Sequence, residues 1–261
     1  MSTTRIAFTI LLNGLHHLRH NNFYEKMLEN FDHWIIVEGV ASPNGSTNWC
    51  KQLPDTVHKN YLSNDGTTEF LDQYRHPKIR IIRPVGGPWD SKDQQVNAGI
   101  MEIKKITNEC FLWQVDVDEQ WEIEDLIFAE RILVHNKGKT GCFLCNYFVG
   151  PNQLVKGEWG EGLREPYRRL WLWKGEDFKS HEPPTLNGNN GPGFLVPVKF
   201  NHYAYYFEKD VKFKEMYYQG YDGLHQRWLK VQDNRDTVSV SQLLGDNTWW
   251  SRTNTVITYI Q

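Results

Sequence analysis

Cysteine is scarce in this chain of 261 residues, and the four that occur are scattered: Cys50, Cys110, Cys142 and Cys145. Four thiols at such spacings are too few for the disulfide framework of a small secreted domain. Cys142 and Cys145 have the spacing of a metal or redox pair, but no second pair completes a zinc site. In a strand, residues three apart also face opposite sides. We therefore expect reduced cysteines and a cytoplasmic protein.

Long apolar runs and an excess of basic residues are also missing. The longest apolar runs, residues 6–12 and 34–37, are far too short for a transmembrane helix, and residues 5–12 lack the length and cleavage site of a signal peptide. The net charge is -3, and Arg164, Arg168 and Arg169 form the densest basic group. Nucleic-acid binding normally requires a clustered basic surface, so we expect no nucleic-acid partner and no transmembrane segment.

The first half of the chain alternates apolar strands with helices. Strands are expected at residues 6–12, 34–39, 78–83 and 111–115, and helices near 23–30, from 65 onward and near 92–106. Buried strands that alternate with helices are typical of an α/β fold with a doubly wound, mainly parallel sheet. Ligands of such sheets bind beyond the carboxyl ends of the strands.

The second half is rich in aromatic residues and has a different pattern. Strands at 140–149, 167–173 and 195–206 are expected to be mixed or antiparallel, with helices near 211–218 and 226–231. Between them, residues 182–193 are dense in Pro, Gly and Asn and are expected to form a loop.

A cluster of carboxylates follows the strand at 111–115. Asp116, Asp118 and Glu119 come directly after the apolar run. Side chains alternate along a strand, so we expect Asp116 and Asp118 to converge on one face at its carboxyl end. Two such carboxylates suit a hard divalent cation that keeps waters or phosphate oxygens as its other ligands. A plain acidic turn is the alternative for a lone pair of this kind.

Two other strand and helix ends carry polar groups. A helix that begins near Ser91 offers unsatisfied N–H groups to a phosphate or a base edge. Asp90, Asp93 and Asn97 are three and four residues apart and are expected on one face of it, with capping as the alternative for Asp90. Glu38 ends the second strand, where its carboxylate could accept hydrogen bonds from ribose or a base; the alternative is a helix cap or a loop ion pair.

These motifs together resemble nucleotide-sugar-dependent glycosyltransferases of the GT-A fold, most of all the family-2 type, with some likeness to the family-17 N-acetylglucosaminyltransferases. The resemblance covers roughly residues 5–220, and Glu38 stands where family-2 enzymes usually carry Asp. The matching segments are 36–39 with the turn 42–47, 89–97, 116–119, 169–173, 181–182 and 202–206 with Lys214 and 217–218.

The resemblance implies a single GT-A-like domain over residues 1–261. Its nucleotide-binding half would cover about residues 1–120, its acceptor and catalytic half about 121–230, and a C-terminal tail about 231–261. The donor would be a UDP-, GDP- or dTDP-sugar and the acceptor a glycan or glycoconjugate, with inversion at the transferred sugar.

The resemblance also assigns roles at the acidic cluster. Asp118 would bind Mn²⁺ or Mg²⁺ directly, and Asp116 would contact ribose or the metal through water. A third metal ligand is expected from the second half, with His202 the first choice and His181 the second. Residues expected to bind the nucleotide sugar are Glu38, Asp90, Asp93, Asn97, Asp116, Arg169 and Lys214, with Arg168 as a further phosphate candidate.

Glu182, at the root of the Pro- and Gly-rich loop, is the best candidate for the general base that deprotonates the acceptor hydroxyl. Glu161 and Glu165 are its rivals. The loop 183–193 would close over the bound donor and exclude water. An acceptor sugar could stack on the aromatic residues Trp159, Trp171 and Trp173, for which core packing is the alternative.

Three other functions compete with this interpretation. A phosphotransferase with an Asp nucleophile would carry its Asp-x-Asp motif after the first strand, whereas here the motif follows about residue 115. A sugar nucleotidyltransferase would need a Gly-rich, basic loop after the first strand, and residues 13–17 supply neither repeated Gly nor Lys. A non-catalytic carbohydrate-binding protein would not need paired metal carboxylates.

Overall fold

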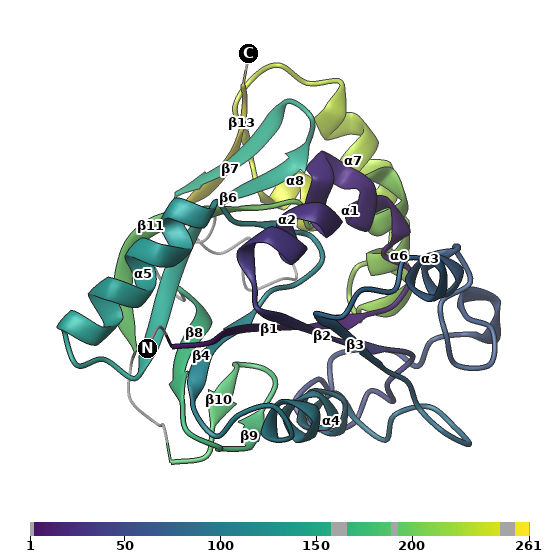
Figure 1. Ribbon diagram of the computed structural model, residues 1–261. Coiled ribbons are helices and arrows are strands. Elements are labelled where there is room, and N and C mark those ends of the chain that lie inside the picture. Colours follow the sequence, from purple (N-terminus) through teal and green to yellow (C-terminus); the bar gives the residue numbers. More distant parts are fainter. Residues whose placement is uncertain (1–2, 158–165, 189–192, 246–253, 261) are drawn as a thin grey trace.

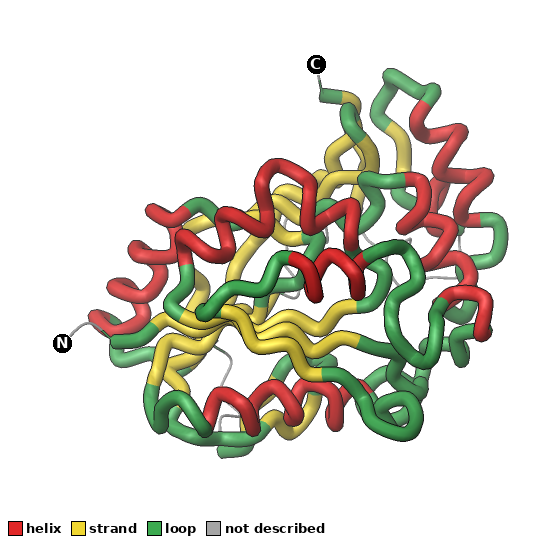
Figure 2. Tube along the Cα trace, turned by 45° about the vertical axis from the view of Figure 1, so that its right-hand side comes forward, coloured by secondary structure: helices red, strands yellow, loops and turns green. Residues whose placement is uncertain are grey.

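A computed structural model describes residues 3–157, 166–188, 193–245 and 254–260, which form layers of helices around one large sheet (Figures 1 and 2). The strands are β1 (Arg5–Leu11), β2 (His33–Glu38), β3 (Ile79–Ile82), β4 (Cys110–Gln114), β5 (Glu119–Gln120), β6 (Thr140–Gly150), β7 (Gln153–Gly157), β8 (Tyr167–Trp173), β9 (Phe178–Ser180), β10 (Thr185–Leu186), β11 (Phe194–His202), β12 (Val238–Ser239) and β13 (Thr255–Tyr259). The α-helices are α1 (Leu15–Arg19), α2 (Phe23–Asn30), α3 (Thr67–Gln73), α4 (Lys92–Lys104), α5 (Ile123–His135), α6 (Glu208–Tyr217), α7 (Leu224–Gln232) and α8 (Ser241–Leu244). Two single 3-10 turns cover His20–Asn22 and Asp55–Val57.

The first half contains the parallel part of the sheet. Its strand order is β3-β2-β1-β4, and all three pairings are parallel. The carboxyl ends of β1, β2 and β4 therefore lie along the same edge, which is where an α/β sheet binds ligands. The expected α/β fold class with a mainly parallel central sheet is confirmed.

The two faces of this parallel part are covered by different helices. Figure 1 shows α2 on one face of β1 and β2 and α4 on the other. Side chains alternate accordingly: Ala7 and Trp34 join the core on the α2 side, whereas Phe8 and Ile35 pack with Ile100 of α4. Burial on both faces explains why these strands read as continuous apolar runs.

The second half extends the same sheet with a mixed pattern, as expected. β8 pairs antiparallel with both β4 and β6, and β6, β7, β13 and β12 continue the antiparallel order. β11 pairs parallel with β6 and antiparallel with the short β5, which brings the end of β11 beside the acidic segment.

Some elements differ from the sequence-based expectation. Helix α5 was not predicted, although the acidic residues in its first turn and its buried Leu126, Ala129 and Leu133 have helical spacing. The segment expected to be entirely loop contains β10, which pairs with β9, while residues 189–192 lie outside the described part. Among the described residues, no helix combines the length and apolarity needed to cross a bilayer.

Candidate functional site

The acidic segment after β4 forms a turn and not a continuing strand. β4 ends at Gln114, and the backbone N–H of Glu119 donates to the carbonyl of Asp116 at 2.9 Å. The alternation that predicted a common face for Asp116 and Asp118 holds only along an extended strand. The turn sends the two carboxylates to different partners, which corrects the expected convergence.

Arg169 of β8 binds two of the three carboxylates. Its Nε and Nη2 donate to Glu119 at 2.6–3.0 Å, and its Nη2 also donates to Asp116 Oδ2 at 2.9 Å. Burial disfavours the charged guanidinium, but Glu119 and Asp116 hold the pKa of Arg169 above its ordinary value. The donors of Arg169 therefore balance the charge of the turn from inside the protein, instead of facing an open phosphate site.

Asp118 is paired with His202, which ends β11. His202 Nε2 lies 3.5 Å from Asp118 Oδ2, and the backbone N–H of Tyr203 donates to the Asp118 carbonyl at 2.7 Å. Burial alone would raise the pKa of Asp118, but His202, Lys214 and His17 hold it well below its ordinary range. Asp118 is thus a partly exposed, charged carboxylate beside an imidazole, at the carboxyl edge of the sheet.

Helix α4 holds the segment that carries His181 and Glu182. Asp93 Oδ1 accepts the backbone N–H of His181 at 2.7 Å. The Asn97 amide donates to the Phe178 carbonyl at 3.0 Å and accepts from the Phe178 N–H at 2.9 Å. These two residues, which were expected at the nucleotide, use their side chains to fix β9 and the following turn against α4.

Ser91, and not Asp90, caps α4. Ser91 Oγ accepts the N–H of Gln94 at 3.0 Å. The exposed Asp90 exchanges two further hydrogen bonds with the Gln94 side chain, at 2.7 and 2.9 Å. This reciprocal arrangement is a variant of the capping box and explains Asp90 without a ligand.

Charged groups from three other segments act on Lys92, near the acidic turn. Burial lowers the pKa of Lys92 in the first turn of α4; Cys50, Glu182 and Asp116 oppose that shift, in that order, and Lys214 of α6 adds to it. Glu182 is exposed, whereas His181 is buried and has a pKa well below its ordinary value, first because of burial and then because of positive neighbours. The structure thus gathers Asp116, Glu182, Lys92 and Lys214 within electrostatic reach.

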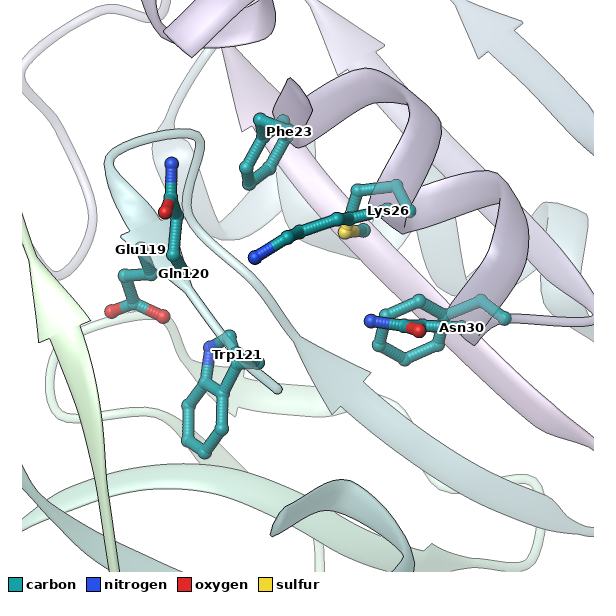
Figure 3. A pocket seen from close by; sticks show the side chains of 8 residues that line it. Phe23, Lys26, Asn30, Glu119, Gln120 and Trp121 are labelled. Atoms are coloured by element: carbon teal, nitrogen blue, oxygen red, sulfur yellow. The ribbon is translucent and has the colours of Figure 1, made fainter. Parts of the chain in front are cut away.

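A pocket lies behind the acidic turn (Figure 3). It is lined by Phe23, Lys26, Met27, Asn30, Phe31, Glu119, Gln120 and Trp121. Its lining includes Glu119 but neither Asp116 nor Asp118, so it lies on the helix α2 side of the turn.

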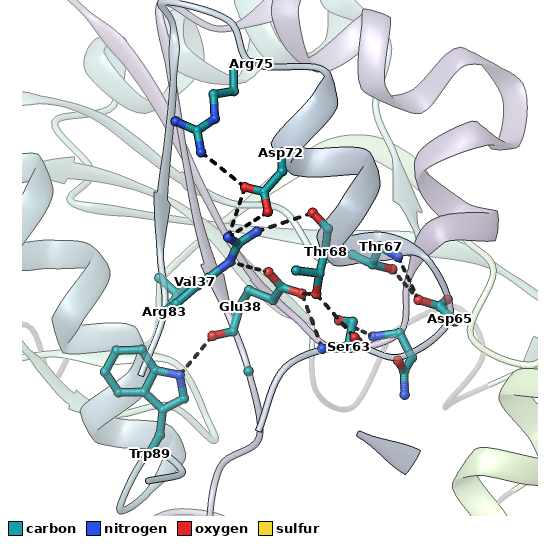
Figure 4. A network of polar contacts seen from close by, with 12 residues as sticks. Val37, Glu38, Ser63, Asp65, Thr67, Thr68, Asp72, Arg75, Arg83 and Trp89 are labelled. Atoms are coloured by element: carbon teal, nitrogen blue, oxygen red, sulfur yellow. Dashed lines mark hydrogen bonds and ion pairs between the residues drawn. The ribbon is translucent and has the colours of Figure 1, made fainter. Parts of the chain in front are cut away.

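Glu38 is fully buried in an internal network (Figure 4). Arg83 Nε donates to its Oε2 at 2.8 Å, and its Oε1 accepts from the Thr68 hydroxyl and from the Ser63 N–H. Of the two expectations for Glu38, the loop ion pair describes this geometry. The carboxylate is not open to a ribose in this structure.

Several other predicted residues lie away from the charged edge. Trp171 and Trp173 are fully buried in the core, which excludes them as a platform for an acceptor sugar. Trp159, Glu161 and Glu165 lie outside the described residues.

Sequence reasoning missed Lys92 and a cluster of His16, His17 and Asp210. Two consecutive His after the first strand are the only local signal, because their partner lies 194 and 193 residues further along the chain. Lys92 belongs to no recognisable sequence motif. Only its position in the first turn of a predicted helix could have indicated that it lies near the site.

The predicted metal ligands are Asp116, Asp118, His202 and His181. Of these, Asp118 and His202 fit a divalent cation best. One carboxylate and one imidazole adjoin there, and His202 Nδ1 is buried with no hydrogen-bond partner in the described part of the chain. Asp116 is turned toward Arg169, whereas the buried His181 imidazole, like that of His202, has an Nδ1 with no hydrogen-bond partner among the described residues. The pair could supply two ligands to a metal whose other positions are filled by water or phosphate oxygens.

Comparison with known proteins finds no matching protein family and no matching curated protein. Similar solved structures include S. aureus TarS 1–349, with 13% identity and a TM-score of 0.36, covering 54% of this chain and 35% of that one. The same protein in complex with UDP-GlcNAc gives 14% identity and a TM-score of 0.34 over 55% and 34% of the two chains. This chain therefore spans about a third of the length of those TarS chains.

A second similar structure is a 4-diphosphocytidyl-2C-methyl-D-erythritol synthase. It has 13% identity and a TM-score of 0.39, and the match covers 67% of this chain and 77% of that chain. These values describe a partial likeness of the chain trace, and the site above is defined by the residues of this chain alone.

Proposed function

We propose that this protein is a metal-dependent glycosyltransferase that moves a sugar from a nucleoside diphosphate to a hydroxyl of a glycan or glycoconjugate, with inversion. The observation that carries the proposal is the position of Asp118 and His202. They adjoin at the carboxyl edge of the parallel strands, with two lysines and an exposed carboxylate nearby.

The basic groups of this edge suit a diphosphate. Lys214 acts electrostatically on both Asp118 and Lys92, and the two ammonium groups lie against the rings of Tyr205, Tyr218 and Tyr217. Asp118 and His202 would hold Mn²⁺ or Mg²⁺, which when bound neutralises charge that develops on a departing diphosphate. The lysines would add to this neutralisation and orient the diphosphate oxygens.

Glu182 is proposed as the general base. Its carboxylate would take the proton of the acceptor hydroxyl while that oxygen forms a bond to the anomeric carbon and the bond from that carbon to the diphosphate oxygen breaks. Asp93 and Asn97 would act as positioning residues, because they fix the backbone on either side of Ser180.

The test measures thermal stability with UDP, GDP and dTDP, with and without Mn²⁺ or Mg²⁺. One nucleotide should raise the melting temperature only when the metal is present, by roughly 5–10 °C at about a hundredfold excess over Kd. Asp118→Asn should abolish this shift, and Asp233→Asn, a change at an exposed helix end, should leave it intact. A full shift in Asp118→Asn, or a shift without metal, would refute the metal assignment.

A second arm separates binding from chemistry. Glu182→Gln should keep the metal-dependent shift and lose sugar transfer from the corresponding nucleotide sugar to an acceptor. If the wild type instead releases pyrophosphate from a nucleoside triphosphate and a sugar phosphate, the protein is a nucleotidyltransferase. Glycan binding without turnover of any donor would identify a carbohydrate-binding protein.

A further inference from the structure

A second set of metal-ligand side chains lies where α1 meets α6 (Figure 1). His16 and His17 are consecutive residues of α1, and Asp210 is in the first turn of α6. In the described part of the chain, these three form the one group of three or more His, Cys, Asp or Glu side chains whose ligand atoms all lie within 4.8 Å of one another.

The geometry of this group is specific. His16 Nε2 lies 2.8 Å from Asp210 Oδ1, and His17 Nε2 lies 2.8 Å from Asp210 Oδ2. Consecutive residues of a helix point about 100° apart, so two neighbouring imidazoles converge on one carboxylate only through a particular pair of side-chain conformations. The two rings are 4.1 Å apart between centroids.

The surroundings hold both imidazoles in place and keep the group accessible to a small ion. Phe207 packs edge-on against both rings, at 4.9 and 5.2 Å between centroids. His17 is 5% exposed, while the side chains of His16 and Asp210 are 13% and 18% exposed. His16 Nδ1 is buried with no hydrogen-bond partner among described residues, so the Nε2 contact is what orients this ring.

The chemistry of the donor set selects the type of ion. Two imidazole nitrogens and one carboxylate suit Zn²⁺, Fe²⁺ or Co²⁺, whereas Mg²⁺ prefers oxygen ligands. Three protein ligands leave a coordination position open for water or an anionic oxygen. Without a metal, the two Nε2–H groups can donate to the same carboxylate, so the group is already assembled before an ion binds.

We propose that His16, His17 and Asp210 form a binding site for a divalent transition-metal ion of the Zn²⁺ type, separate from the Asp118–His202 pair. The ion would replace the protons that now link the two rings to Asp210 and would fasten α1 to α6. A positive charge there would also act on the acidic turn, since His17 already influences Asp118.

The test uses metal alone, on protein first freed of metals with a chelator. Wild type should bind one Zn²⁺ at this site by calorimetry, and Co²⁺ at the same site should give a visible d–d absorption band that Zn²⁺ removes. Mg²⁺ should not compete. His16→Gln and His17→Gln, which keep an N–H donor for Asp210, should each weaken Zn²⁺ binding by more than about tenfold.

Two controls separate this site from others. His225→Gln alters an imidazole that lies 2.8 Å from Glu208 on α6, a His–carboxylate contact with a single His. It should leave binding unchanged. Asp118→Asn removes a ligand of the other proposed site and should still allow Zn²⁺ to bind at His16, His17 and Asp210. Because no nucleotide is used, the result does not depend on the proposed function.

A third measurement needs no variant. With histidine-selective isotope labelling, Zn²⁺ should shift the imidazole resonances of two His side chains in the wild-type chain. Absence of Zn²⁺ binding, or binding that His16→Gln and His17→Gln leave unchanged, would overturn the proposal and identify the group as a hydrogen-bonded triad only.

Discussion

Arg169 determines which carboxylate of the acidic turn is available. It is 5% exposed and donates to Glu119 and Asp116, so two of the three carboxylates already have a cationic partner. Asp118 instead lies beside His202, whose imidazole can also bind a metal ion. The chemistry of the turn is therefore concentrated on one residue, and the proposed function depends on Asp118 more than on Asp116.

A prediction at the residue scale concerns acid stability. Burial opposes ionisation of Asp210, yet its hydrogen bonds to His16 and His17 lower its pKa from 3.8 to about 2. A carboxyl with a depressed pKa in the folded state contributes stability that is present above the unfolded value and is lost as the pH falls through the folded value. The difference between the unfolded and folded pKa corresponds to about 2 kcal/mol in the free energy of unfolding.

In metal-free protein, about half of that contribution should disappear between about pH 5 and pH 3. Urea unfolding across this range measures it, with Asp210→Asn as the comparison. The free-energy difference between wild type and variant should shrink toward low pH, and a constant difference would contradict the assigned pKa.

At the scale of elements, α4 connects the parallel sheet to the segment with the proposed base. Its inner face packs on β1 and β2 through Val96 and Ile100, while Asp93 and Asn97 bind the backbone of residues 178–181. An Asn inside a helix is unfavourable by propensity alone. Here its amide satisfies both backbone groups of Phe178, which accounts for its position.

Asn97→Ala should therefore destabilise the protein although Ala favours the helix. Leaving the Phe178 N–H and carbonyl without partners should cost about 1–3 kcal/mol, against a gain of about 0.5 kcal/mol in helix propensity. Thermal unfolding measures the sum, and hydrogen exchange of the Phe178 amide reports the local effect. Asn97→Asp retains an acceptor and should keep that amide protected; unchanged exchange in Asn97→Ala would show that β9 does not need this contact.

The elements were more predictable than their contacts. Local patterns placed most strands and helices, because periodicity and flanking Gly or Pro are local properties. Helix α5 has a local pattern that is adequate to predict it. The contacts of Glu38 with Arg83 and of Asp210 with His16 join segments distant in the sequence, and no local pattern specifies them. The turn at Asp116 was missed because strand alternation was extended beyond Gln114.

On the scale of the whole molecule, one sheet runs through both halves of the chain. It extends from β3 in the first half to β12 and β13 near the C-terminal end. One core cluster contains residues from both halves, among them Trp34, Phe143 and Ile257. The parallel and antiparallel parts therefore share buried surface and should not unfold separately.

We predict one cooperative unfolding transition for the described fold. Urea curves followed by far-ultraviolet circular dichroism and by tryptophan fluorescence should coincide, because neither half can expose its core without disrupting the other. Two separated transitions would instead indicate independent units and would contradict a single domain. Ile257→Ala, which removes buried side-chain atoms from β13, should shift both curves equally.

The burial of all four cysteines gives the experimenter a practical advantage. Burial is the main cause that raises the pKa of each thiol, that of Cys110 to about 12. Thiolates are the form that reacts with alkylating dyes, so the folded chain should remain unlabelled at these positions. A fluorophore could then be attached to one cysteine introduced at the exposed Lys179, three residues before the proposed base, with every native thiol left in place.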